Sequence, residues 1–476
     1  MNHQPSALIL ALQQLLGEQH VFQETQALSP FLAEKRARFS SSCLAVVSPA
    51  STEEVSDCVK LCADHQVSIV PQGGNTGLVA GTVSQPEQII LSTRRLNKIR
   101  EIDVENYSIT AESGVILENI QNAVKDQNRF FPLSLGAQGS CHIGGNLATN
   151  AGGINVLRYG NTRDLCLGIE VVTANGDILS DLTGLRKNNT GYDLKNLFIG
   201  SEGTLGIITA ATLKLFPTPK SSVTALVALP NLESANKLFG ELREASSDQI
   251  STFELIPRLA VVLTEQYFAQ HVDPFESDHP WYVLTALHAN AADFPLTSCL
   301  ENTLEKGLEQ EWVNDAVIAQ SEAQAQKLIL FREHLVETQA KQGGAISHDV
   351  SVPISRIAEF IECANREVIK AIPGARPYPF GHFGDGNIHY NVLQPVETTK
   401  AEYFEKAEML NQLVYKIVDQ FSGSFSAEHG VGLLKIGEMS QYKNPTALVT
   451  MRAIKIALDP DNLFNPGKVI PAQTSD

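Results

Sequence analysis

The chain contains no long apolar segment. No stretch approaches the roughly 18 uninterrupted apolar residues that a membrane-spanning helix needs, and the 476 residues are 43% hydrophobic, as in ordinary soluble proteins. The first lysine or arginine is Lys35, so the short apolar run at residues 8–12 lacks the basic flank of a signal peptide. We therefore expect a cytoplasmic protein without a transmembrane segment.

Positive charge is scarce as well. The chain has 36 lysines and arginines against 53 aspartates and glutamates, which gives a formal net charge of −17, and its basic residues form no dense block. These features argue against nucleic acid or an anionic membrane surface as a partner. A small anionic substrate would need local positive groups to bind against the overall negative field.

Cysteines are few and irregularly spaced. Seven is an odd number, and their scatter along the chain fits reduced thiols better than a disulfide framework. Cys58 and Cys62 stand four positions apart on a predicted helix and could form part of a metal site. Because no further ligand lies near them in the sequence, burial as small apolar side chains is the favoured interpretation.

The chain is longer than one hydrophobic core usually serves, so two or three domains are expected. Apolar periodicity predicts a helix over about 1–39, and a capping-box pattern at 51–54 predicts another helix before a strand at 67–70. Beyond residue 221, strand-like segments alternate with charged helical ones, including a helix over 322–341. The predicted domains are 1–220, 221–420 and 421–476.

Two glycine-rich segments mark the first half of the chain. Neither contains the G-x-G-x-x-G fingerprint or a G-K-[ST] phosphate loop, which disfavours NAD and ATP. The segments, Pro71–Gly77 and Gly136–Gly153, place many backbone N–H groups close together, and such backbone can approach the phosphate and carbonyl oxygens of a large cofactor. Taken alone, the first segment could equally be a tight turn.

Histidines and a carboxylate gather among glycines in the last quarter of the chain. His382 and His389 flank the turn Gly384–Asn387, and Glu428 lies in a second glycine-flanked segment. Two imidazoles and a carboxylate, with coordination positions left open, are typical of a catalytic divalent metal site. The alternative is that the histidines only form hydrogen bonds within a polar turn.

Two neighbouring residues complete this predicted site. His429 directly follows Glu428, and since it cannot easily serve as both ligand and base, we assign it the general base. Asn391 lies two positions beyond His389. On an extended strand both side chains point to one face, where Asn391 could contact a bound ligand.

These motifs resemble those of the FAD-linked D-2-hydroxyacid dehydrogenases of the vanillyl-alcohol oxidase superfamily, the group that contains D-2-hydroxyglutarate dehydrogenase, D-lactate dehydrogenase and glycolate oxidase subunits. The resemblance extends from about residue 46 to residue 468. It implies an α+β fold with a two-subdomain FAD-binding domain of the vanillyl-alcohol oxidase type. It also implies an α+β substrate domain built on an antiparallel sheet, and a C-terminal segment that returns to the flavin.

The resemblance further implies which residues bind FAD. They lie in the segments that match the family at 71–78, 132–153 and 200–207 and in a C-terminal loop. They are Pro71, Gly73, Gly74, Asn75, Thr76, Gly77, Leu78, Pro132, Gly136, Gly139, Ser140, Gly144, Gly145, Asn146, Thr149, Asn150, Gly152, Gly153, Glu202, Gly203, Gly206, Ile207 and Asn465. Asn75 lies in a loop where covalent relatives carry a flavin-linking histidine, so non-covalent FAD is expected.

In the same resemblance, His382, His389 and Glu428 bind Zn2+, or Mn2+, Co2+ or Fe2+ in its place. The metal would bind the 2-hydroxyl and the carboxylate of a D-2-hydroxy acid, His429 would take the hydroxyl proton, and hydride would pass to flavin N5. Without a nicotinamide motif, the electrons are expected to pass to an electron-transfer flavoprotein or a quinone-linked acceptor. A homodimer is compatible with the sequence.

The predicted substrate contacts are Arg332, Asn391 and Ser347. Arg332 matches an arginine that binds a substrate carboxylate, a role that suits a guanidinium, whereas without the resemblance a solvated arginine would be the ordinary interpretation. Dicarboxylate-type relatives often carry a lysine where this chain has Ser347. We therefore expect broader acceptance of D-2-hydroxy acids, unless Lys341 or His348 compensates.

Two other functions remain compatible with these residues. A metal-dependent hydrolase could use the histidines and Glu428 to activate water, with a phosphate ester bound by the glycine-rich segments. A flavin-binding subunit without turnover of its own is the other alternative. Bound flavin would exclude the hydrolase, and bleaching of the flavin by substrate would exclude the inert subunit.

Overall fold

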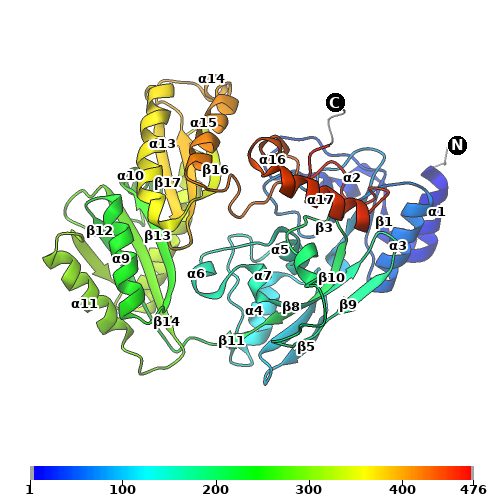
Figure 1. The fold of residues 1–476 in the computed structure, drawn as a ribbon, viewed down its shortest axis with the longest axis horizontal. Coiled ribbons are helices and arrows are strands. Elements are labelled where there is room, and N and C mark those ends of the chain that lie inside the picture. Colours follow the sequence, from blue (N-terminus) through cyan, green and yellow to red (C-terminus); the bar gives the residue numbers. More distant parts are fainter. Residues whose placement is uncertain (1–4, 473–476) are drawn as a thin grey trace. The chain divides into compact units, whose positions relative to one another are not determined.

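The computed structural model describes residues 5–472, which form two compact units. The first unit comprises Met1–Gly153, Gly160–Thr218 and His429–Asp476, and the second comprises Ile154–Tyr159 and Pro219–Glu428. The chain therefore leaves the first unit and returns to it at its C-terminal end (Figure 1). The domain boundaries near 220 and 420 remain a prediction.

Within the described residues, the strands of the first unit form three sheets. Their strand orders are β1-β2-β4-β3, β5-β6-β10-β8-β9 and β11-β7. The strands are β1 (Val21–Phe22), β2 (Ala45–Val47), β3 (Ile69–Gln72), β4 (Ile89–Ser92), β5 (Ile99–Asp103), β6 (Ser108–Glu112), β7 (Arg129–Phe130), β8 (Cys166–Val172), β9 (Ile178–Asp181), β10 (Ile207–Lys214) and β11 (Phe216–Pro217). The helices are α1 (Pro5–Leu16), η1 (Glu18–His20), α2 (Thr25–Leu32), α3 (Thr52–Asp64), η2 (Thr93–Arg95), α4 (Leu117–Lys125), α5 (Ile143–Thr149), α7 (Thr162–Leu165), α8 (Lys195–Phe198), α16 (Ile436–Tyr442) and α17 (Pro445–Leu458).

The predicted helix after residue 51 is confirmed as α3. Ser51 Oγ accepts the N–H of Glu54, and the Glu54 carboxylate accepts the N–H of Ala50, so both partners of the capping pattern satisfy the helix start. Cys58 and Cys62 are fully buried in the core that α3 shares with the first sheet. Burial raises the pKa of the Cys62 thiol to about 12. Both are thus small core side chains, as favoured from the sequence.

The single helix expected over about 1–39 is wrong. Residues 1–4 lie outside the described part of the chain, and α1 ends before Gly17, whose φ of 86° is easy only for glycine. A strand and α2 follow. The second glycine-rich segment also differs from a plain loop, because α5 runs through its middle.

The C-terminal segment joins the core of the first unit, as expected. Phe464 forms a parallel bridge with Ile69 at the start of β3, and it is completely buried. The Ile69 N–H donates to Leu463 O, and the Asn465 N–H donates to Ile69 O. Residues 463–465 therefore pack beside the start of β3, from which the first glycine-rich loop directly continues.

The second unit is built on one seven-stranded sheet in the order β15-β12-β14-β13-β17-β18-β16, and every neighbouring pair in it is antiparallel. The strands are β12 (Ser221–Leu229), β13 (Ile250–Pro257), β14 (Trp281–Ala289), β15 (Asp315–Ile318), β16 (Ala345–Ser351), β17 (Arg376–His382) and β18 (Asn387–Leu393). The helices are α6 (Val156–Tyr159), α9 (Leu232–Ala245), α10 (Arg258–Tyr267), α11 (Leu296–Glu309), α12 (Glu322–Lys341), η3 (Ile354–Arg356), α13 (Ile357–Ala371), η4 (Phe383–Asp385), α14 (Lys400–Phe404) and α15 (Ala407–Gln420).

Helices cover this sheet in two groups. Helices α11, α9, α13 and α15 pack beside one another in one layer (Figure 1), and α10 packs against α12. Helix α12 has the bounds expected from the sequence and begins at Ser321, whose side chain accepts the Gln324 N–H. Its residues Phe331 and Leu335 belong to the same core as Tyr378 and Phe380 of β17. Helix α12 therefore lies over the part of the sheet that carries the predicted metal ligands.

Between residues 5 and 472, no helix combines the length and the apolar character that crossing a membrane would require.

Candidate flavin and metal sites

A tight hairpin brings the two predicted histidine ligands together. His382 ends β17 and His389 lies in β18, and the turn between them closes through η4 and Gly386. Gly386 has a φ of 89°, and a Cβ there would lie 2.5 Å from Val352 O, so this position requires glycine. The glycine pattern seen in the sequence thus corresponds to a turn that side chains would obstruct.

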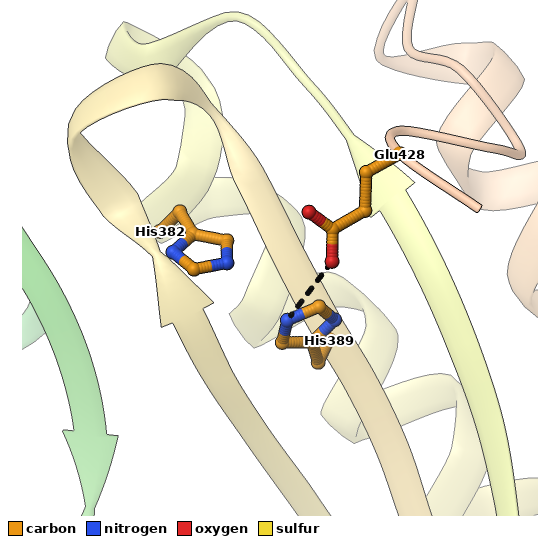
Figure 2. Close-up of side chains that lie close together, drawn as sticks. All are labelled: His382, His389 and Glu428. Atoms are coloured by element: carbon orange, nitrogen blue, oxygen red, sulfur yellow. Dashed lines mark ion pairs between the residues drawn. The ribbon is translucent and has the colours of Figure 1, made fainter. Parts of the chain in front are cut away.

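Glu428 reaches the same place from the segment after α15. One ligand atom from each of His382, His389 and Glu428 lies within 4.8 Å of the others. His389 Nε2 is 3.8 Å from a Glu428 oxygen (Figure 2). The centroids of the His382 and His389 rings are 5.4 Å apart, and the angle between the ring planes is 75°. All three belong to the second unit, so the structure brings the predicted ligands together. Their donor set suits zinc.

The opposite nitrogen of His382 meets a carboxylate that the sequence did not suggest. Glu254 of β13 is the cross-strand partner of His382, and its Oε1 lies 2.5 Å from His382 Nδ1. Burial alone would lower the pKa of His382, but Glu254 outweighs it and raises this pKa to about 9. Burial likewise opposes ionisation of Glu254, yet Arg332 and His382 hold its pKa well below the usual range.

The second histidine also faces a carboxylate across the sheet. Asp349 of β16 pairs in register with His389, and its Oδ1 lies 3.9 Å from His389 Nδ1. Asp349 accepts hydrogen bonds from the Asn387 side chain at 2.9 Å and from the Glu428 N–H at 3.0 Å. Asp349 thereby connects the hairpin to the backbone of Glu428, the third predicted ligand. The sequence reasoning assigned no role to Asp349 or Glu254.

Arg332 lies on α12 and is buried. Its Nε donates to Glu254 Oε2 at 2.7 Å, and its guanidinium carbon stands 5.3 Å from the centre of the Phe380 ring. Its Nη2 is buried without a hydrogen-bond partner in the described part of the chain. A solvated arginine is therefore excluded, and the substrate contact assigned to it remains a prediction.

Asn391 and Ser347 are cross-strand partners in the next row of the sheet. The Asn391 side chain is buried, where it donates to Gln339 Oε1 at 2.7 Å and accepts the N–H of His348. Its role as a substrate contact remains a prediction, as does that of Ser347.

Neither His348 nor Lys341, the two residues expected to compensate for the missing lysine, points toward Ser347 and Asn391. The His348 ring bonds to Tyr390 O and to Asn411, which places it on the opposite face of β16 from Ser347. The Lys341 ammonium lies 4.3 Å from the centre of the Phe268 ring at the end of α12.

The first unit contains a pocket formed by its glycine-rich segments. The predicted cofactor residues that line it are Pro71, Gly73, Gly74, Asn75, Thr76, Gly77, Gly144, Gly145, Asn146, Thr149, Glu202, Gly203, Gly206 and Ile207. The predicted cofactor residues that are not among its lining are Leu78, Pro132, Gly136, Gly139, Ser140, Asn150, Gly152, Gly153 and Asn465. His429, predicted as the base, also lines this pocket.

The pocket has the properties of a place for a large polar ligand. A Cβ on Gly145 would meet nothing within 4 Å, so this backbone faces open space, whereas a Cβ on Gly74 would lie 2.3 Å from Ser140 O. Thr93 Oγ1, His142 Nδ1 and Asn146 Oδ1 are buried along the lining without hydrogen-bond partners among residues 5–472. Buried polar atoms normally have partners, so these atoms fit a cofactor rich in donors and acceptors. His142 and Thr93 were not predicted from the sequence.

Glu202 holds the segment that begins with His429. Its two carboxylate oxygens accept the N–H groups of Val431 at 2.7 Å and Gly432 at 2.8 Å. Burial raises the pKa of Glu202, although these N–H groups oppose the shift. Asn465 donates to Glu202 O and to Gly81 O, so its side chain links the C-terminal loop to the pocket wall. Glu202 and Asn465 thus shape the pocket through backbone contacts.

Comparison with known proteins identifies the two halves of the chain. Residues 43–181 match the family described as FAD binding domain, and residues 218–469 match the family described as FAD linked oxidases, C-terminal domain. The chain belongs to the FAD-linked oxidases. This confirms the predicted family and FAD as the cofactor, for which the pocket residues of the first unit are suited.

The chain is 38% identical over 461 residues to a D-2-hydroxyglutarate dehydrogenase of Xanthomonas citri pv. viticola, with 97% of this chain and 96% of that protein covered. It is 37% identical over 434 residues to a putative mitochondrial D-lactate dehydrogenase of Schizosaccharomyces pombe, covering 89% and 81%. Among solved structures, p-cresol methylhydroxylase with substrate bound superposes with a TM-score of 0.76 at 18% identity, covering 98% of this chain and 97% of that one. The predicted fold of the vanillyl-alcohol oxidase type is confirmed.

We expect the FAD to be non-covalent, because Asn75 is an amide held by bonds to Ala33 O and Thr82. Acid precipitation of the purified protein should release the flavin into the supernatant. Yellow colour retained in the pellet would contradict this expectation. In that event His142→Ala would show whether this histidine, whose Nδ1 is buried without a hydrogen-bond partner among residues 5–472, is the attachment point.

We expect His382, His389 and Glu428 to hold one divalent ion, with zinc favoured by the imidazole and carboxylate donors. Elemental analysis of His389→Ala should show the loss of roughly one equivalent of metal relative to the parent protein, since one zinc occupies one such site. His334→Ala on α12 is the matched control, because it removes an imidazole outside the cluster. Equal metal in the parent and in His389→Ala would defeat the assignment.

Proposed function

We propose that the chain oxidises D-2-hydroxy acids to 2-oxo acids with non-covalent FAD, a divalent metal ion and His429 as the general base. The observation that supports this most directly is the pair Glu428–His429. Glu428 belongs to the metal-ligand cluster, and His429 lines the flavin pocket. The peptide bond between them keeps a metal ligand and a candidate base adjacent.

When bound, FAD accepts a hydride and a divalent ion acts as a Lewis acid on the 2-hydroxyl of the substrate. The residues of the chain then have separate tasks. His382, His389 and Glu428 leave coordination positions open for the hydroxyl and the C1 carboxylate. A ring nitrogen of His429 takes the hydroxyl proton as the C2 hydrogen leaves, and the bonds from Glu202 to Val431 and Gly432 hold the backbone that follows this base.

Arg332 is the cation proposed to bind a substrate carboxylate. Its Nε is occupied by Glu254, whereas its buried Nη2 has no hydrogen-bond partner in the described residues. A buried guanidinium N–H without a partner is costly, and a carboxylate oxygen would satisfy it with a charge-assisted bond. One arm of the guanidinium thus remains for the substrate.

The curated relatives are named for D-2-hydroxyglutarate and for D-lactate, which differ by a second carboxylate. Ser347 supplies no charge for such a group, and the contacts of His348 and Lys341 direct both of them elsewhere. We therefore propose that the chain selects hydroxyglutarate less strongly than dicarboxylate-type relatives do, and that it also accepts D-lactate and longer monocarboxylates.

The reduced flavin is proposed to pass its electrons to an electron-transfer flavoprotein or to a quinone-linked acceptor. The cytoplasmic location and a homodimer also remain predictions. The hydrolase alternative is set aside because the first half of the chain matches an FAD-binding domain. Bleaching of the flavin by D-2-hydroxy acids, with an artificial dye as final acceptor, is the experiment that tests the proposed function and excludes an inert subunit.

His429→Asn should slow flavin reduction by ~10²–10⁴-fold, the usual contribution of a positioned general base. Stopped-flow bleaching measures this rate directly, and the FAD content should stay close to that of the parent. His65→Asn, in the same unit at the end of α3, is the matched control and should leave the rate unchanged. A rate for His429→Asn within a few-fold of the parent would remove His429 from the base role.

Ser347→Lys should raise the ratio of kcat/KM for D-2-hydroxyglutarate over D-lactate by about 10–100-fold, because a hydrogen bond to a charged group contributes about 1.5–3 kcal/mol. Ser347→Met adds length without charge and should leave the ratio near that of the parent. If the parent already prefers hydroxyglutarate by more than about 10³-fold, or ~4 kcal/mol, another group holds the second carboxylate.

A further inference from the structure

Glu254 is a buried charge within an otherwise uncharged strand. All eight residues of β13 are buried, and Glu254 itself is 1% exposed. An ionised carboxylate in such surroundings is stable only when its oxygens are paired and hydrogen-bonded. An apolar residue at this position would pack without needing hydrogen-bond partners. The groups that Glu254 contacts therefore indicate its role.

Each oxygen of Glu254 has its own partner. Oε2 accepts the N–H of Arg332 Nε at 2.7 Å, and Oε1 lies 2.5 Å from Nδ1 of His382. The antiparallel register of β13 and β17 places Glu254 directly opposite His382. The contact to the histidine therefore follows from the sheet itself and does not depend on a flexible loop.

We propose that Glu254 is a positioning residue for the metal site: it accepts the Nδ1–H of His382 and so directs the Nε2 lone pair of this imidazole toward the metal, while Arg332 balances its charge. Histidine ligands of metal ions commonly donate their second ring N–H to a carboxylate in this way, which fixes the tautomer and makes the ligand more basic. The inference rests on the metal site proposed above.

The other predicted ligand histidine, His389, faces the carboxylate of Asp349 at a greater distance. Asp349 Oδ1 is 3.9 Å from His389 Nδ1, beyond hydrogen-bond distance, and Asp349 instead accepts from Asn387 and from the Glu428 backbone. Of these two carboxylate–imidazole pairs, the one between Glu254 and His382 is the closer. Loss of the Glu254 carboxylate should weaken one ligand while the hairpin and Glu428 stay in place.

The test measures the zinc dissociation constant of the FAD-loaded protein by competition with a chelator. Glu254→Gln and Glu254→Ala should bind zinc roughly 10–100-fold more weakly than the parent, the usual effect of removing such a partner, with the larger loss in Glu254→Ala. Asp273→Asn is the matched control: Asp273 pairs with Arg258 and Tyr282 in the same unit, outside the cluster. It should keep the affinity of the parent.

The outcomes separate this inference from the metal site on which it rests. If His382→Ala loses zinc but both Glu254 variants bind within about threefold of the parent, far short of the loss expected for an orienting partner, the positioning role is overturned alone. If the parent binds no zinc, or His382→Ala binds it as the parent does, the proposed metal site fails as well. The FAD content should be equal in all variants.

A measurement on the parent protein covers the case in which the Glu254 variants do not fold. Long-range nitrogen NMR of histidine-labelled, cadmium-substituted protein identifies which ring nitrogen of His382 carries the metal and which carries the proton. We expect the proton on Nδ1 and the metal on Nε2. Metal bound through Nδ1 would overturn the proposal, because Glu254 occupies the space in front of that atom.

Discussion

The register of four neighbouring strands is the constraint on which the predicted metal-ligand cluster depends. The pairing of β13 with β17 sets Glu254 opposite His382, and the pairing of β18 with β16 sets His389 opposite Asp349. Because side chains alternate between the two faces of a sheet, a slip of one residue in either pairing would turn a histidine away from its carboxylate. The buried side chains of Tyr378 and Phe380 under α12 oppose such a slip, since it would remove them from the core that they share with Phe331 and Leu335. Packing of the core and geometry of the ligands are thus specified by the same pairing.

In the first unit, the pocket for the large cofactor is lined by backbone and by buried polar atoms that lack hydrogen-bond partners among residues 5–472. Its pocket is lined mainly by turns, a short helix and glycines, and their positions are held from behind by buried groups. Glu202 is the clearest case, because one carboxylate satisfies the consecutive N–H groups of Val431 and Gly432, in the segment that starts with His429. The position of the proposed base therefore depends on a residue more than two hundred positions earlier in the chain.

Local sequence patterns predicted the local features well. The hairpin between His382 and His389, helix α12 and the cap of α3 follow from glycine placement, periodicity or capping residues, whereas the return of the C-terminal segment was implied by the family resemblance. The helix expected over about 1–39 was wrong because apolar periodicity was given more weight than Gly17, which stops the helix. Glu254 was missed because its partner lies 128 positions away, and only strand pairing brings them together. One signal was available, since a lone carboxylate among eight residues that form a buried strand rarely lacks a polar partner.

Charge balance around the metal ligands links these observations to substrate choice. Glu254, Asp349 and Glu428 place carboxylates around the predicted metal ligands, and Arg332 with one divalent ion would supply positive charge to balance them. A bound monocarboxylate would then add a single net negative charge, which the open metal positions and Arg332 Nη2 can contact directly. A dicarboxylate would add a second negative charge to a chain whose net charge is already −17, and the row that contains Ser347 and Asn391 offers it only neutral groups. Glu254, which is proposed to orient His382, already pairs with Arg332. A second substrate carboxylate would therefore compete with Glu254 for the same cation.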